Sequence, residues 1–124
     1  MVDDKRPNLW VGHISMKTQV LDLSETFMKE IGLRSIFRGD TVAVLELRGG
    51  THIVLAEDKS NEPTLVGFDF MVEDLDAIHA QYKSRGYPVS DIEPGSIHNS
   101  FVLTEPGGNL IKVNSTHVPD HSLV

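Results

Sequence analysis

The chain begins with a stretch in which apolar and polar residues alternate. In residues 9–16 (LWVGHISM), Ile14 and Met16 fall on one side, and His13 and Ser15 fall on the other. Alternation over this length is typical of a strand with one buried face, because successive side chains of a strand point to opposite sides. The pattern therefore predicts a half-buried strand at residues 9–16.

Helical spacing follows this strand. Between Val20 and Ile31, apolar residues recur three or four positions apart, including Leu23 and Phe27, and Gly32 stands where a left-handed cap would end a helix. Three strand-like runs come next, separated by turn residues, at 34–38, 41–47 and 51–57. The first half of the chain is thus predicted to have the order βαβββ.

The same order begins again at Leu65. Residues 65–72 alternate as a strand, Asp74 is expected to cap a second helix, and Gly86 repeats the role of Gly32. Three more strands are expected, at 89–92, 100–104 and 109–115. The predicted fold class is α+β, a single domain of residues 1–124. It contains two βαβββ modules, at about 9–57 and 65–115, a polar connector at 58–63 and a polar tail at 116–124.

Composition removes several classes of function. With 11 Lys and Arg against 18 Asp and Glu, the net charge is −7, which repels phosphate backbones and argues against a nucleic-acid partner. The chain has no cysteine, so disulfides, thiolate zinc sites and iron–sulfur clusters are excluded. No apolar run approaches the roughly 20 residues that span a bilayer, and the first residues lack an apolar signal core. We therefore expect a cytoplasmic protein without a membrane partner.

A polar strand face is the expected functional surface. Each helix can cover only one face of its strands, and a curved sheet leaves a concave side that is the usual place for a ligand. By strand parity, this second face carries His13, Ser15, His52, Val54, Asp69, Leu110, Lys112 and Asn114. The two modules are therefore expected to form a curved-sheet cleft lined by these residues.

Three motifs carry a resemblance to a known family. The run GHISM opens the first module, MVEDLDA leads into the second helix, and EPGGNLIKV forms the last hairpin. In this order they resemble the vicinal oxygen chelate superfamily, the group of glyoxalase I, extradiol dioxygenases, fosfomycin-resistance enzymes and bleomycin-resistance proteins. The likeness covers residues 9–114 and is closest between EPGGNLIKV and the family run D-P-D-G-N-x-(I/V)-E-(L/V). The resemblance implies the paired-module cleft and a homodimer.

The resemblance also implies where a metal would be held. Enzymes of the family bind a divalent metal with a His on the first strand, usually a Glu or His on the fourth, a His on the fifth and a Glu on the eighth. Matched residue by residue, the first position is His13, but the others fall on Val54, Gly67 and Lys112, or on Phe68 in an alternative register of the fifth strand. A protonated lysine has no lone pair for a metal. We therefore expect the usual metal site to be missing and no cofactor to be bound.

The charged pair of the predicted cleft has two interpretations. Asp69 lies between Phe68 and Phe70, so it should point away from the core and into the cleft, where Lys112 is its expected partner. A paired, partly buried couple costs less than either charge alone. The pair either balances the charge of the pocket or takes an active part.

The histidines leave a second alternative open. His13 and His52 with Asp69 could form a displaced site of two histidines and one carboxylate, a type that suits iron, manganese, nickel or zinc. His98 precedes a strand in a loop that could fold over the cleft mouth and contact the ligand, or serve as an added metal ligand or general base. His79, His117 and His121 are expected at the surface.

Two functions of different classes follow. The leading hypothesis is a small-molecule-binding protein resembling bleomycin-resistance proteins, whose ligand is contacted by His13, His52, Asp69, Lys112, Asn114 and His98. The alternative is a metal-dependent lyase or dioxygenase, glyoxalase-like, that uses the displaced set His13, His52 and Asp69. A third possibility is a subunit whose cleft is filled by side chains. Whether the protein is an enzyme stays open at this point.

Overall fold

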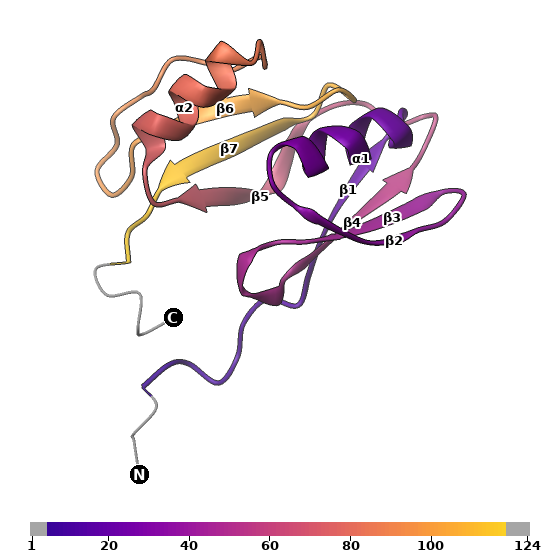
Figure 1. The fold of residues 1–124 in the computed structure, drawn as a ribbon, viewed down its shortest axis with the longest axis horizontal. Helices are drawn as coiled ribbons and strands as arrows, with labels where there is room; N and C mark the ends of the chain where they lie inside the picture. The colour runs from indigo at the N-terminus through magenta and orange to yellow at the C-terminus, as the bar shows by residue number, and fades with distance from the viewer. Residues whose placement is uncertain (1–4, 119–124) are drawn as a thin grey trace.

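Two helices and two small sheets make up the computed structural model, which describes residues 5–118 (Figure 1). The elements in chain order are β1 (His13–Thr18), α1 (Leu21–Glu30), β2 (Arg34–Arg38), β3 (Val42–Glu46), the 3-10 turn η1 (Arg48–Gly50), β4 (His52–Glu57), β5 (Leu65–Val72), α2 (Leu75–Ser84), β6 (Ser100–Thr104) and β7 (Leu110–Ser115). Within the described residues, no helix is long and apolar enough to cross a membrane.

Both sheets follow one plan. The first has the order β1-β4-β3-β2 and the second has the order β5-β7-β6. In each sheet, the first strand of the module lies parallel to the last one, and the remaining neighbours are antiparallel. Helix α1 packs on β3 and β4, and α2 packs on β7, so each sheet has one covered face and one open face. The predicted α+β fold of two repeated modules is confirmed.

The start of β1 differs from the prediction. The strand begins at His13 and not at Leu9, and Trp10 is 74% exposed. The pairing with β4 explains the difference, because its register runs from His13 opposite His52 to Thr18 opposite Glu57. A strand extends only as far as its partner supplies a ladder of hydrogen bonds. Before His13, two hydrogen bonds reach this segment: the His52 N–H donates to the Gly12 carbonyl at 2.9 Å, and the Thr51 hydroxyl donates to the Val11 carbonyl at 2.7 Å.

The strand predicted at residues 89–92 does not form. Only two isolated bridges occur there, Val89 with Leu103 and Glu93 with Ser100. Between them, the Ser90 hydroxyl oxygen accepts the hydrogen bond of the Val102 N–H at 2.8 Å, in the place of a backbone carbonyl. The side chain thus replaces a rung of the ladder, and the second module is βαββ with an irregular edge.

Helix α1 turns a different stripe to the core from the one predicted. Leu23 is 58% exposed, whereas Ser24 and Glu25 are buried beside Leu21 and Met28. Each of the two polar residues has a partner: Ser24 bonds Thr18 and Glu105, and Glu25 binds Arg38 at 3.0 Å. Because both side chains are satisfied, the helix can bury them in place of Leu23.

Helix α2 follows the prediction more closely. The Asp74 carboxylate accepts a hydrogen bond from the Ala77 backbone N–H at 3.0 Å, as expected of an N-cap. Gly32 and Gly86 follow the two helices with φ of 116° and 79°, a left-handed conformation that side chains disfavour. The caps predicted for both modules are therefore confirmed.

The cores of the modules interlock. Phe27 of α1 belongs to the apolar cluster around Phe101 and Val113 in the second module. Ile111 of β7 belongs to the cluster around Leu45 and the rest of the first module. The two modules therefore share their apolar contacts and cannot each keep an intact core alone.

A buried carboxylate also joins the modules. Glu105 is 1% exposed, and its carboxylate accepts hydrogen bonds from the Ser24 hydroxyl at 2.6 Å, the Gly107 N–H at 2.9 Å and the Asn109 N–H at 3.0 Å. The Asn109 side chain in turn donates to the Lys17 carbonyl at 2.8 Å. The motif EPGGN, which identified the hairpin in the sequence, thus ties β6 and β7 to β1 and α1.

Candidate functional site

The open face of the first sheet carries two distinct rows of side chains. The strand register places one polar row across β1, β4, β3 and β2: His13, His52, Glu46 and Arg34. It places a second, mainly apolar row beside it: Ser15, Val54, Val44 and Phe37. The opposite face is covered by α1 and holds the buried residues of the same strands. This face therefore offers hydrogen-bonding groups next to an apolar surface.

Direct contacts link the members of the polar row. The His52 Nε2 lies 3.0 Å from the Glu46 Oε2, and the Arg34 guanidinium binds the other carboxylate oxygen of Glu46. The rings of His13 and His52 meet edge to face, with centroids 5.7 Å apart. The hydrogen bond with His52 and the ion pair with Arg34 hold the pKa of Glu46 below its ordinary value. Glu46 is therefore an ionised carboxylate between two partners.

Sequence reasoning missed the part that Glu46 plays. The predicted site included His52 but neither Glu46 nor Arg34. A signal was available for Glu46, because Glu46 and His52 each lie three positions from Gly49, the middle residue of the Arg48–Gly50 turn, and hairpin strands pair outward from their turn. Arg34 has no such signal, since a bulge interrupts β2 between Ser35 and Phe37.

The second sheet places Asp69 and Lys112 side by side, but not as an ion pair. They are register partners on β5 and β7, both exposed on the open face. Among the ion pairs of residues 5–118, none within 4.0 Å joins them. The prediction of a partly buried ion pair is therefore wrong for the single chain. Water solvates both charges, so an ion pair between them would add little stability. Asn114 lies on β7 opposite Met71 and Ser100 and is buried.

His98 lies apart from the polar row. Its Nδ1 bonds the Ser115 carbonyl at 2.9 Å, so this nitrogen carries the proton, and its ring packs on His117 with centroids 4.8 Å apart. All its described contacts are at the end of β7. His79, which was expected at the surface, is half-buried: its Nε2 bonds the Ser90 carbonyl at 2.8 Å and its ring packs on Phe101. His121 lies outside the described residues.

The donor set does not fit a metal held in the way the family resemblance implies. Val54, Gly67 and Lys112 occupy the matched positions, and none of them supplies a metal ligand. Asp69 lies on the second sheet, whereas the carboxylate that reaches His52 is Glu46. Throughout residues 5–118, no group of three or more His, Asp or Glu side chains is arranged to hold a metal ion.

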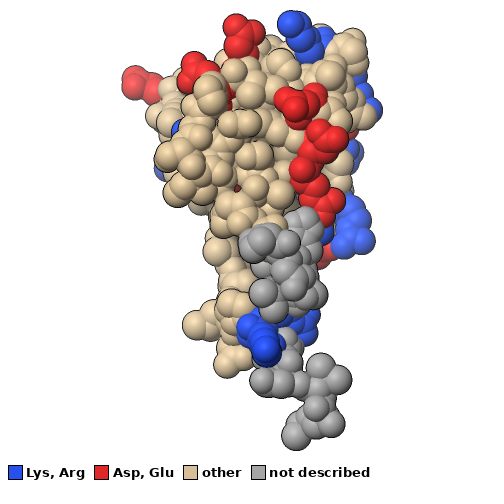
Figure 2. All heavy atoms as spheres, turned by 90° about the vertical axis from the view of Figure 1, so that its left-hand side faces the viewer, with Lys and Arg blue, Asp and Glu red and all other residues tan. Residues whose placement is uncertain are grey.

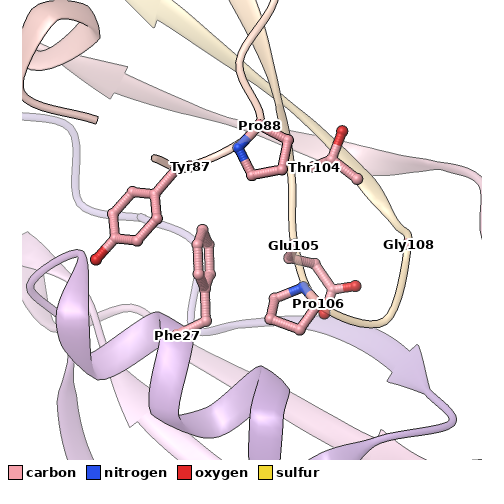
Figure 3. Close-up of a pocket in the computed structure, with 7 residues that line it drawn as sticks. All are labelled: Phe27, Tyr87, Pro88, Thr104, Glu105, Pro106 and Gly108. Carbon is pink, nitrogen blue, oxygen red and sulfur yellow. The ribbon is translucent and has the colours of Figure 1, made fainter. Parts of the chain in front are cut away.

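A hollow on the other side of the molecule is a weaker candidate. It has a volume of about 420 Å³ and is lined by Phe27, Tyr87, Pro88, Thr104, Glu105, Pro106 and Gly108 (Figure 3). Phe27 rises from α1 toward Tyr87, and the two rings meet edge to face at 5.0 Å (Figure 3). The one charged residue, Glu105, already accepts four hydrogen bonds from Ser24, Gly107 and Asn109. The hollow thus offers no free charged group to orient a ligand.

The surface charge is uneven. Figure 2 shows acidic side chains across the top and down one side of the face that lies at the left of Figure 1, with a broad uncharged area between them.

Comparison with known proteins finds similarity in structure but not in sequence families. No family model and no curated protein matches the chain. An integron cassette protein from the mobile metagenome of Halifax Harbour sewage outfall has a TM-score of 0.76 and 21% identity, over 86% of this chain and 98% of its own. Lactoylglutathione lyase from Agrobacterium tumefaciens has a TM-score of 0.75 and 16% identity, over 90% and 97%.

A third solved structure is a bleomycin resistance determinant encoded on the transposon Tn5, with a TM-score of 0.70 and 18% identity, over 89% of this chain and all of its own. Each comparison covers nearly the whole chain, so the likeness concerns both modules and their arrangement. Identities this low establish the fold alone. The chain therefore has the fold of the vicinal oxygen chelate proteins, which the motifs GHISM, MVEDLDA and EPGGNLIKV had indicated.

Proposed function

We propose that the protein binds a small organic molecule against the open faces of its sheets and does so without the metal of the related enzymes. The observation that carries the proposal is the pair of rows on the first sheet, with the polar groups His13, His52 and Glu46 beside an apolar strip. Small-molecule sites typically combine a mostly apolar lining with a few placed polar groups. An antibiotic binding protein from Streptomyces sp. CB03234 has a similar structure, with a TM-score of 0.68 and 19% identity, and supports a binding function.

The apolar row would supply most of the binding energy. Phe37 is 55% exposed on the open face, beside the half-buried Val44 and Val54. Covering apolar surface with a ligand stabilises the complex by roughly 25 cal/mol per Å². The polar row would then orient the ligand, and Asp69 and Lys112 on the second sheet would contact it from the other module.

We propose further that a second copy of the chain completes the cleft. The open faces carry exposed apolar side chains on both sheets, including Phe37, Leu65 and Met71. Such surfaces favour association, and a homodimer is the commonest symmetric solution. Sedimentation of the purified chain at several concentrations tests this proposal; a monomer at all of them would contradict it.

The metal-dependent alternative, a lyase or dioxygenase, has less support. It requires a carboxylate with His13 and His52 that can bind a metal, but Glu46 is held by Arg34 on one oxygen and by His52 on the other. Elemental analysis of protein purified without chelators separates the two functions. A stoichiometric amount of iron, manganese, nickel or zinc that is lost in both His13→Ala and His52→Ala would contradict metal-free binding and support the metal-dependent function.

Binding itself can be tested with an apolar fluorescent probe, 8-anilinonaphthalene-1-sulfonate. We expect saturable fluorescence enhancement that is lost in Val54→Asp, because a charge in the apolar row repels the probe and costs its desolvation. The matched control is Leu23→Asp, which changes an exposed leucine on α1, away from the open face. Equal binding by Val54→Asp and the natural protein would contradict the proposed surface. Competition by bleomycin would then ask whether the ligand class extends to that antibiotic.

A further inference from the structure

The contact between His52 and Glu46 determines which nitrogen of His52 carries a proton. An ionised carboxylate can only accept hydrogen bonds, and the Glu46 Oε2 lies 3.0 Å from the His52 Nε2. The Nε2 must therefore be the protonated nitrogen of the neutral ring. The lone pair of the neutral imidazole is then on Nδ1.

Arg34 reinforces this arrangement. Its guanidinium binds the Glu46 oxygen that does not face His52, so both carboxylate oxygens have a partner. A nearby cation favours the ionised form of a carboxylate, and an ionised Glu46 keeps the proton of His52 on Nε2. Arg34 and Glu46 are thus positioning residues for His52.

The Nδ1 of His52 is an acceptor of the row that the described residues leave unused. Within the described part of the chain, His52 makes one side-chain hydrogen bond, through Nε2, and its Nδ1 has no partner. The side chain is 30% exposed, so a ligand can reach it. The other titratable groups facing it are His13 on β1, Glu46 on β3 and, through Glu46, Arg34 on β2.

The neighbouring row defines the rest of the ligand. Val54 follows His52 by two residues on the same face of β4, with Val44 and then Phe37 beside it. A flat apolar group can lie on these side chains while a polar group at its edge reaches Nδ1. Arg34 and Glu46 offset one another, so the row presents no net charge to attract an ionised ligand.

We propose that Glu46 and His52 form a proton-accepting pair that takes a planar ligand bearing an acidic hydroxyl group, such as a phenol, through the His52 Nδ1. The hydroxyl donates its hydrogen bond to Nδ1. When the hydroxyl is acidic enough, its O–H bond breaks and an Nδ1–H bond forms, which leaves an oxyanion beside an imidazolium. Glu46 then balances the imidazolium charge. This inference rests on the proposed binding function and names the ligand chemistry of the same face.

The test uses 4-nitrophenol as the probe and 4-nitroanisole, its methyl ether, as the control ligand without a proton. At a pH below the pKa of free 4-nitrophenol, we expect the bound probe to show the absorption of the phenolate. We also expect it to bind about tenfold more tightly than the ether, which is about 1.4 kcal/mol. Glu46→Gln should weaken 4-nitrophenol binding about tenfold, remove the phenolate band and leave 4-nitroanisole binding unchanged.

The control variant is Glu57→Gln, since Glu57 lies on the same strand but binds Lys59 at 3.1 Å and not His52. It should change neither ligand's affinity. If both ligands bind equally and both are lost in Val54→Asp, the binding function stands and the proton-accepting pair is wrong. If neither ligand binds, the assigned ligand class is wrong, whereas the fluorescent probe still decides whether the face binds small molecules at all.

A measurement without ligand completes the test. Nitrogen-15 NMR of the imidazole rings distinguishes the two neutral tautomers. We expect His52 in the Nε2–H form in the natural protein and a mixture of tautomers in Glu46→Gln. An Nδ1–H form in the natural protein would overturn the inference whatever the ligand data show.

Discussion

Replacing Glu105 with glutamine should lower the free energy of unfolding by about 2–4 kcal/mol. The carboxylate is fully buried and accepts hydrogen bonds from the Ser24 hydroxyl, the backbone of Gly107, and the backbone and side chain of Asn109, at 2.6 to 3.2 Å. Glutamine has nearly the same shape, so packing is kept. One of its two terminal atoms, however, is an amide nitrogen, which must then face hydrogen-bond donors that the carboxylate accepts from.

The magnitude follows from counting the donors that lose their acceptor. Each carboxylate oxygen of Glu105 accepts two of the four hydrogen bonds. An amide nitrogen in place of Oε2 faces the two Asn109 donors, and in place of Oε1 it faces the Gly107 N–H, whereas the Ser24 hydroxyl can turn and accept from it. An unsatisfied buried donor costs about 1–3 kcal/mol, and the remaining hydrogen bonds lose the strength that the carboxylate charge gives them, which together supports a cost of about 2–4 kcal/mol. For a domain of this size, the corresponding fall in melting temperature is on the order of 10 °C.

Urea denaturation with a constant m-value measures the change directly. The matched control is Glu62→Gln in the connector, where the carboxylate is exposed and the change should be within about 0.5 kcal/mol. A Glu105→Gln protein as stable as the control would contradict the prediction, because it would show that the hydrogen bonds of Glu105 between the two modules contribute no stability.

Three further predictions concern single positions. Gly107→Ala should cost about 1–3 kcal/mol in urea denaturation, because the new Cβ would overlap the Thr18 Oγ1 and lie 2.7 Å from the Glu105 Oε2. Asp74→Ala should cost about 1 kcal/mol by removing the cap of α2, and Asp74→Asn should restore most of it. The pKa of Glu46 is lowered in the folded protein, mainly by the hydrogen bond with His52. Ionised Glu46 therefore stabilises the fold above the unfolded pKa of about 4.3, and this contribution is lost as the pH falls through the lower folded pKa. Urea midpoints measured from pH 7 to pH 3 should therefore fall less steeply in Glu46→Gln, and an unchanged slope would contradict the assignment.

Local pattern was sufficient for much of the fold. The bounds of β2, β5 and β6 follow directly from alternation and turn residues, and Gly32 and Gly86 were identifiable as helix ends. These features depend on the conformational preferences of a few adjacent residues, which any sequence displays. Parity likewise placed His13 and His52 on one face.

Other features depended on partners distant in the chain. The alternating residues before His13 form no strand, because β4 does not extend far enough to pair with them. Leu23 stays outside the core, because Ser24 forms buried hydrogen bonds with Thr18 and Glu105 and takes its place. Periodicity reports which side chains share a face, but not which strand or carboxylate will reach that face.

The two halves of the candidate site show the same division. Sequence alone placed Asp69 and Lys112 on the open face, but only the tertiary structure showed that their strands are neighbours and that both side chains are exposed without forming an ion pair. It also decided that Glu46 is the partner of His52. The physical reason is that alternation along a strand is a local property, whereas a hydrogen bond between strands depends on register, bulges and access to water, which arise only when the sheets assemble.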